Sequence, residues 1–181
     1  MAEFEYSPQK MHAAIQFFCR NIKNQSLGRT KLAKLLYYVD FDHFEQYDRP
    51  VTGATYKHYP MGPYPQEMMS EIKQLRNTGQ LEETEQANGP YPQYLYTVPP
   101  DATVDLGIFE TSELQTLIDV ANKWQQLSAT ELVAATHGEA PWIATEDGKV
   151  IQYEYAYYRH KFEPVPDDED REGETIPLVS L

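Results

Sequence analysis

The sequence lacks several features that would place the chain in a known class at once. It contains one cysteine, Cys19, so no disulfide can form within the chain. No apolar run approaches the length of about 18 residues that a transmembrane helix needs. The N-terminus "MAEFEYSPQK" has neither the basic nor the apolar region of a signal peptide. We therefore expect a cytoplasmic protein that does not cross a membrane.

Motifs for metal, cofactor and catalytic chemistry are also missing. The five histidines include no His-Glu-x-x-His pair, and there is no second cysteine for a zinc site. Neither glycine-rich phosphate loop, G-x-x-x-x-G-K-[ST] or G-x-G-x-x-G, occurs, and the hydrolase signature G-x-S-x-G does not occur either. We therefore expect no metal and no cofactor, and the positive evidence for catalysis is thin.

Basic residues are few. Lys and Arg number 15 against 28 Asp and Glu, which gives a formal net charge of -13. A chain this acidic repels phosphate backbones, which argues against nucleic acid as the main partner. Part of the charge lies in "PDDEDREGE", where the composition shifts to proline and acid. The shift predicts a domain over 1–163 and a loosely ordered acidic tail over 164–181.

Helical periodicity predicts a mainly α fold, a compact helical domain of about five or six helices. Ser7 as N-cap and Pro8 at the first helical position begin the first helix. Ser128 and Glu131 match a capping box before a short helix that ends near His137. The expected helices are 7–24, 29–47, 66–78, 112–127 and 128–137.

A small antiparallel β element should accompany the helices. "QLEET" and "QYLYTVP" predict two short strands, and the "EQANGPYP" loop between them is longer than a minimal hairpin loop. In "ATYKHYPMGPYPQEM", Tyr56 and His58 are expected on one face of a short strand, where three prolines exclude a helix or a central strand. The segment 147–162 is predicted to be a turn followed by a helix or a strand.

Two polar groups beside apolar stripes are candidates for chemistry or for architecture. Asp40 and His43 lie three residues apart on the second predicted helix and can share a face. "THGEAPW" brings His137 and Glu139 near Trp142, a trio that could support acid–base work in a hydrolase. The structural alternative is a hydrogen-bonded, partly buried histidine in each case, with Trp142 filling the core. We predict a polar node of Asp40, His43, His137 and Trp142.

Two blocks of sequence resemble a known family. "KLAKLLYYVDFDHFEQYDRPVTGATYKHYPMGPYPQEM" is similar to the signature of the Panacea antitoxin domain, also called the SocA-like or GepA-like family. The matching parts are the Lys-Leu-x-Lys-Leu-Leu-Tyr helix, the Arg-Pro-x-Thr-Gly turn and the Tyr-to-Gly-Pro stretch at 56–63. A later block, from Leu127 to Trp142, resembles the family's Leu-Ser to Thr-His to Trp element. The longer middle and the acidic tail depart from the family pattern.

The resemblance implies an antitoxin of a bacterial or phage toxin–antitoxin system, which is not an enzyme and whose partner is a cognate toxin protein. The tyrosine-rich segment is the predicted contact surface, through Tyr56, His58, Tyr59, Met61 and Tyr64. Alternatives are a proteolytic adaptor, with a cellular protease as a further partner, and a DNA-binding autoregulator built on the first two helices. The sequence does not identify the toxin or fix the oligomeric state.

Overall fold

A computed structural model describes residues 4–22 and 27–159 of the chain, so the predicted tail over 164–181 and its boundary lie outside the described residues. The fold is mainly α with two small antiparallel sheets, as the sequence predicts. The α-helices are α1 (Pro8–Asn21), α2 (Arg29–Tyr47), α3 (Met68–Asn77), α4 (Thr111–Trp124), α5 (Ala129–His137) and α6 (Ala140–Ile143). The strands and 3-10 helices are β1 (Tyr56–Tyr59), β2 (Gly62–Pro65), β3 (Glu82–Asn88), β4 (Tyr91–Thr97), η1 (Leu106–Ile108) and η2 (Tyr153–Tyr158).

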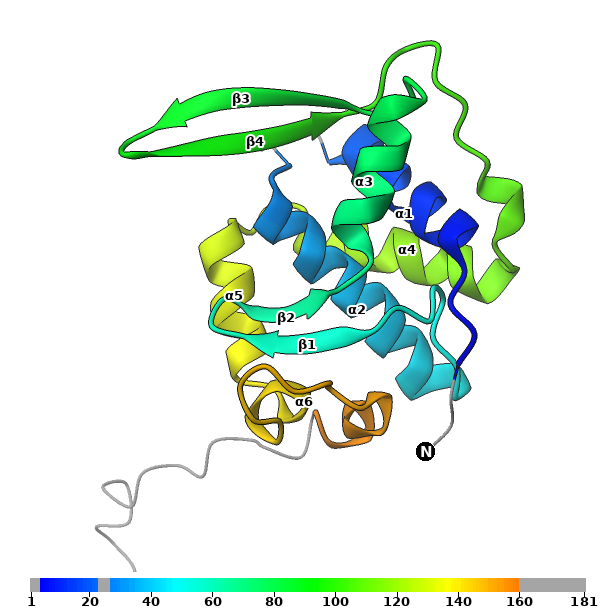
Figure 1. Cartoon of the computed structure of the whole chain (residues 1–181). Helices are drawn as coiled ribbons and strands as arrows, with labels where there is room; N and C mark the ends of the chain where they lie inside the picture. The colour runs from blue at the N-terminus through cyan, green and yellow to red at the C-terminus, as the bar shows by residue number, and fades with distance from the viewer. Residues whose placement is uncertain (1–3, 23–26, 160–181) are drawn as a thin grey trace, which may run out of the picture.

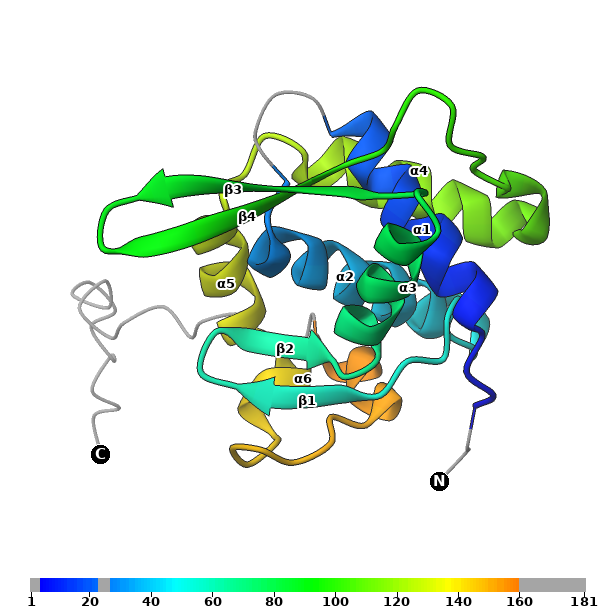
Figure 2. The same cartoon turned by 45° about the horizontal axis from the view of Figure 1, so that its top comes forward.

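Helix α2 is the centre of the fold. Figures 1 and 2 show it in the middle of the molecule, and it contacts α1, α4, α5, β2 and η2. Helix α2 is buried on nearly every side, which places it in the core. Its buried apolar residues are Leu32, Ala33, Leu35, Leu36, Tyr37, Tyr38, Val39, Phe41 and Phe44. The same helix buries Lys31, Lys34, Asp40 and His43, and these polar groups need partners.

The helix ends follow the predicted signals. Ser7 accepts a hydrogen bond from the Lys10 backbone at the start of α1, and Ser128 forms the predicted capping box at the start of α5. Helix α4 begins one residue before the predicted Ser112, because a capping box between Glu110 and Glu113 sets its start.

The β structure differs from the prediction in two places. Strands β3 and β4 are seven residues each and meet at the two-residue turn Gly89-Pro90, so the expected long loop is wrong. Strand β2 pairs with β1 although it contains Pro63 and Pro65, because a two-stranded sheet consists only of edges. The last predicted segment was left open between helix and strand. Residues 153–158 form a 3-10 helix, and residues 148–151 before it bond to β1, with a bridge between Val150 and Lys57.

The two sheets occupy different places. Hairpin β1–β2 lies against α2 and α5, whereas the hairpin of β3 and β4, here called the wing, extends away from the helices (Figures 1 and 2). The wing joins the body at its base, where the Tyr96 backbone N–H donates to the Leu27 carbonyl at 3.0 Å. These placements set which tyrosines a partner can reach.

Candidate protein-binding surface

Strand alternation divides the five predicted contact residues into two groups. Tyr56 and His58 point toward the body from β1, while Tyr59 and Met61 are 39% and 57% exposed at the turn of the hairpin. Tyr64 on β2 is half-buried, and its ring lies edge-on to Tyr59 with centroids 6.1 Å apart. We call Tyr59, Met61 and Tyr64 the hairpin face.

Tyr56 does not belong to that face. Its side chain is 1% exposed, and its hydroxyl donates to the Asp40 carboxylate at 2.8 Å. Its ring packs against Tyr37, Phe41 and Tyr153. The predicted partner contact of Tyr56 is therefore wrong, because the residue is a core anchor for β1.

Asp40 fixes the segment that leads into the hairpin. One of its carboxylate oxygens accepts from the Thr52 backbone N–H at 2.6 Å, and the other accepts from the Thr52 hydroxyl at 2.5 Å and from Tyr56. Burial raises the pKa of Asp40 to about 6, although these three donors act in the opposite direction. The carboxylate is thus a buried acceptor that holds residues 52–56 against α2.

His43 bonds to different partners, not to Asp40. Its Nδ1–H donates to the Arg49 carbonyl at 2.6 Å, and its Nε2 lies 3.1 Å from the Ser112 hydroxyl. Burial lowers the pKa of His43, which favours a neutral ring that accepts from Ser112. Asp40 and His43 therefore bond to different segments. Asp40 holds the segment at residues 52–56, and His43 links α2 to Arg49 and to α4.

Trp142 joins the other half of the predicted node to the hairpin. Its ring stacks on His137 with centroids 4.0 Å apart, and lies 4.3 Å from the ring of His58. Its Nε1–H donates to the Tyr59 carbonyl at 3.3 Å. The structure thus brings His58, His137 and Trp142 together under the hairpin, away from Asp40 and His43.

Lys34 is a residue of this site that the sequence prediction missed. It is 1% exposed, and its Nζ donates to the Pro63 carbonyl at 2.6 Å. Burial lowers the pKa of Lys34 to about 7. Burial also lowers the pKa of His137, and the positive charge of Lys34 adds to that effect. The sequence offered one signal for this burial. Lys34 is the only charged residue in the run "LAKLLYYV", which is otherwise too apolar to give the helix a polar side.

Gly62 allows the hairpin to approach this lysine. Its φ is +88°, and a Cβ there would lie 2.6 Å from Thr136 Oγ1 and 2.9 Å from Lys34 Cε. Only glycine meets both demands, the left-handed backbone and the close approach. The hairpin face is therefore displayed on a strand pair that is bonded and packed from beneath.

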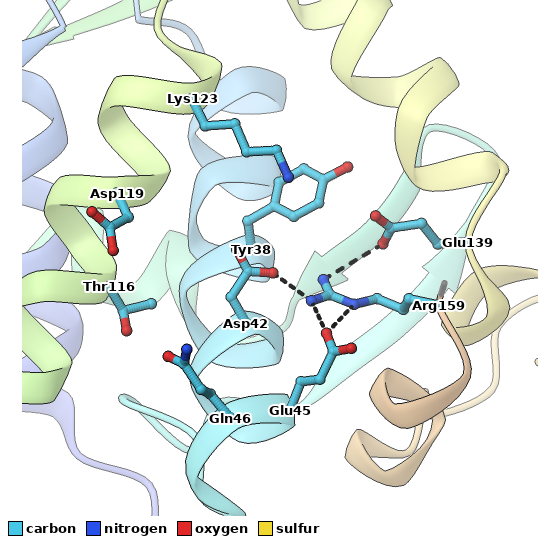
Figure 3. A pocket seen from close by; sticks show the side chains of 9 residues that line it. All are labelled: Tyr38, Asp42, Glu45, Gln46, Thr116, Asp119, Lys123, Glu139 and Arg159. Atoms are coloured by element: carbon cyan, nitrogen blue, oxygen red, sulfur yellow. Dashed lines mark hydrogen bonds and ion pairs between the residues drawn. The ribbon is translucent and has the colours of Figure 1, made fainter. Parts of the chain in front are cut away.

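Glu139 lies in a different place from His137. It lines an open pocket of about 440 Å³ with Tyr38, Asp42, Glu45, Gln46, Thr116, Asp119, Lys123 and Arg159 (Figure 3). Its carboxylate accepts from the Tyr37 hydroxyl at 2.7 Å, and burial raises its pKa. The Arg159 guanidinium lies 2.5 Å from Asp42 and from Glu45, and 3.8 Å from Glu139.

The three residues considered for acid–base chemistry contact different groups. Glu139 accepts from Tyr37 and lies near Arg159, the His137 ring stacks on Trp142, and Asp40 accepts from Thr52 and Tyr56. Within residues 4–22 and 27–159, no group of three or more His, Cys, Asp or Glu side chains is placed to hold a metal ion. In the same ranges, no helix has the length and apolar character needed to span a membrane.

The model of the family described as "Antitoxin SocA-like, Panacea domain" matches residues 32–143, a span that contains most of α2, the hairpin face and Trp142. The chain is also similar to the uncharacterized protein YwgA of Bacillus subtilis (strain 168), with 30% identity over 98 residues. That region is 53% of this chain and 55% of YwgA, so the chain spans about half the length of this curated relative. No solved structure matches the chain.

Proposed function

The chain belongs to the SocA-like Panacea antitoxin family, and from that membership we propose that it neutralises a toxin protein by binding it directly. The family match over residues 32–143 is the observation that carries the proposal. In this proposal the chain acts as a non-catalytic binding partner. It covers the surface through which the toxin acts, and no covalent bond is made or broken.

The hairpin face is our candidate for the centre of the interface. Aromatic residues and methionine are enriched at the centres of protein interfaces, and Tyr59, Met61 and Tyr64 provide both within the matched span. A standard interface buries roughly 1,600 Å² in total, so these three would form its centre rather than all of it. Lys34 and Trp142 hold the hairpin in place, which reduces the entropy lost on binding.

The net charge of -13 should speed association with a basic toxin. Long-range attraction is screened by salt, so the association rate should fall steeply between about 50 and 500 mM NaCl. Stopped-flow fluorescence with the purified toxin would measure it. An association rate that does not change with salt would contradict this part of the proposal.

Co-expression tests the proposal as a whole. The product of the adjacent open reading frame is expressed alone and together with this chain, and growth is followed. We expect arrest in the first case and rescue in the second, with the two proteins co-purifying. Rescue without a stable complex, or no rescue by this chain, would contradict direct neutralisation.

Two matched variants distinguish loss of the contact surface from a general effect of mutation. Tyr59→Ala combined with Met61→Ala removes the exposed part of the hairpin face, and we expect it to abolish rescue. Tyr91→Ala is the control, because Tyr91 is 77% exposed at the wing turn, outside the hairpin face. Equal rescue by both would show that the hairpin face is not the contact.

A further inference from the structure

The wing has two outer strand edges. The edge of β4 forms backbone hydrogen bonds to the body, and, in the part of the chain that the structure describes, the edge of β3 does not. On β4, the Tyr96 N–H donates to the Leu27 carbonyl, outside the β3–β4 ladder. Tyr96 faces Glu83 in the register, so this pair is one of the non-hydrogen-bonded pairs of the ladder. Pairs alternate along an antiparallel ladder, so Glu85 opposite Tyr94 and Ala87 opposite Pro92 are of the same kind.

It follows that Glu83, Glu85 and Ala87 direct their backbone N–H and C=O groups away from β4. No backbone hydrogen bond from these three to another part of the described chain is present. Glu83 is close to the body, where Arg76 pairs with its carboxylate at 2.8 Å. Glu85 and Ala87 are exposed, and this outer edge of β3 is open in both views (Figures 1 and 2).

The open edge lies in the longest stretch of the chain without lysine or arginine. Residues 77–122 contain no lysine or arginine and eight acidic residues. Three of these, Glu82, Glu83 and Glu85, are on β3, and Glu82 and Glu85 have no basic partner within the described residues. Native proteins protect open edges with charged side chains, proline or a bulge. Strand β3 has neither proline nor a bulge, so the negative charge of its glutamates is what deters pairing with another strand.

We propose that the outer edge of β3 receives an extended, lysine- or arginine-bearing segment of a protein partner as a third strand of the wing. Main-chain hydrogen bonds to Glu85 and Ala87 would provide the affinity, as in other cases of strand addition. A basic residue opposite Glu85 would form a cross-strand ion pair, which selects the charge of the segment. An acidic segment would meet like charges on the same edge and be rejected.

A peptide tests this proposal without any toxin, so its failure leaves the proposed function standing. The probe is a labelled octapeptide of alternating lysine and valine, titrated into the full-length chain and followed by fluorescence anisotropy. Two matched peptides are the controls: one with glutamate in place of lysine, and one with alternate backbone nitrogens methylated. We expect the lysine peptide to bind and both controls to bind at least about tenfold more weakly.

Amide hydrogen exchange locates the peptide. Thr84 and Gln86 donate into the β3–β4 ladder, so their amides should be protected with or without the peptide. The amides of Glu85 and Ala87 should exchange quickly in the free chain and become protected when the lysine peptide is added. Binding that leaves Glu85 and Ala87 unprotected would overturn the proposal, as would no binding at all.

A proline variant gives a second, independent test. Ala87→Pro removes an N–H that the β3–β4 ladder does not use, opposite a position where Pro92 is already present in β4. We expect peptide binding at least about tenfold weaker, with the far-UV circular dichroism of the parent chain. The charge variant Glu85→Gln keeps the backbone hydrogen-bonding groups of β3. It should weaken binding of the lysine peptide and leave binding of the glutamate peptide no weaker. Unchanged binding in both variants would exclude the β3 edge.

Discussion

The molecule contains two hairpins of similar design that differ in how much of each is packed against the body. Both consist of two antiparallel strands joined by a two-residue turn. Hairpin β1–β2 lies on α2 and α5, and residues 148–151 bond to its outer edge, as in the 2.9 Å contact from the His58 N–H to Lys149. The wing is bonded to the body along the half nearer its base. Leu27 and Gly28 bond to β4, the Arg29 guanidinium lies over the Tyr94 ring, and Arg76 pairs with Glu83 on β3.

In our proposals, one binding surface is held rigid and the other stays adaptable. An isolated two-stranded hairpin is marginally stable in water, so its order comes from what it packs against. The hairpin face is therefore preformed, which suits specific recognition. The outer part of the wing lacks such support, which suits an edge that is completed by a partner strand.

The largest predicted effect compares the glycines of the two turns. Gly62→Ala combines a φ of +88° with a Cβ 2.6 Å from Thr136 Oγ1, and we expect a loss of about 3 kcal/mol in unfolding free energy. Gly89→Ala has a similar φ of +60° but nothing within 4 Å, so about 1 kcal/mol is expected. Urea unfolding measures the unfolding free energy of both variants. Equal losses would mean that the close contacts of Gly62 with Thr136 and Lys34 do not affect stability.

Removing Asp40 should be nearly as costly. Asp40→Ala leaves the Thr52 N–H, the Thr52 hydroxyl and the Tyr56 hydroxyl without their buried acceptor. We expect a loss of about 3 kcal/mol in urea unfolding, and faster amide exchange at Thr52. Asp101→Ala, at an exposed position, is the control and should change stability by less than about 0.5 kcal/mol. A small loss for Asp40→Ala would show that water replaces the carboxylate.

Because Lys34 is buried beneath hairpin β1–β2, we expect its titration to make the unfolding free energy depend on pH. Its pKa is about 7 in the folded chain and near 10.5 when exposed, so above pH 7 the unfolded state binds more protons. Stability should then rise with pH, by about 2 kcal/mol between pH 7 and 9. Lys34→Met cannot titrate and should lack this rise, which the difference between the two urea curves isolates. Parallel curves would contradict the lowered pKa.

The smallest effect is expected at the wing turn. Tyr91 is 77% exposed, and Tyr91→Ser should change the unfolding free energy by less than about 0.5 kcal/mol. Thermal and urea unfolding of the variant and the parent chain would measure this. A larger loss would show that the wing packs against more of the body than its base.

The helices could be predicted from the sequence because their signals are local. Caps at Ser7 and Ser128 and the apolar spacing of α2 are visible within one or two turns. Helix α6 was missed because four residues are too few for a period. The burial of Lys34 was missed because lysine is almost always exposed, and its acceptor lies on another element.

The hairpins and the site could be predicted only in part because pairing is not local. Prolines in β2 argue against a central strand, and nothing in the sequence shows that this sheet has two strands only. The prediction that Tyr56 and His58 share a face is confirmed, but which face meets the body depends on α2 and Trp142. His137 and Trp142 pack together as neighbours in sequence would, whereas the partners of Asp40 and His43 lie on other segments.

The central claim is that the hairpin face binds a toxin, and calorimetric titration of the purified toxin tests it most directly. The chain carrying Tyr59→Ala and Met61→Ala, shown to keep the stability of the parent, should bind at least about 30-fold more weakly than the parent and the Tyr91→Ala control. Equal dissociation constants for all three chains would contradict the claim.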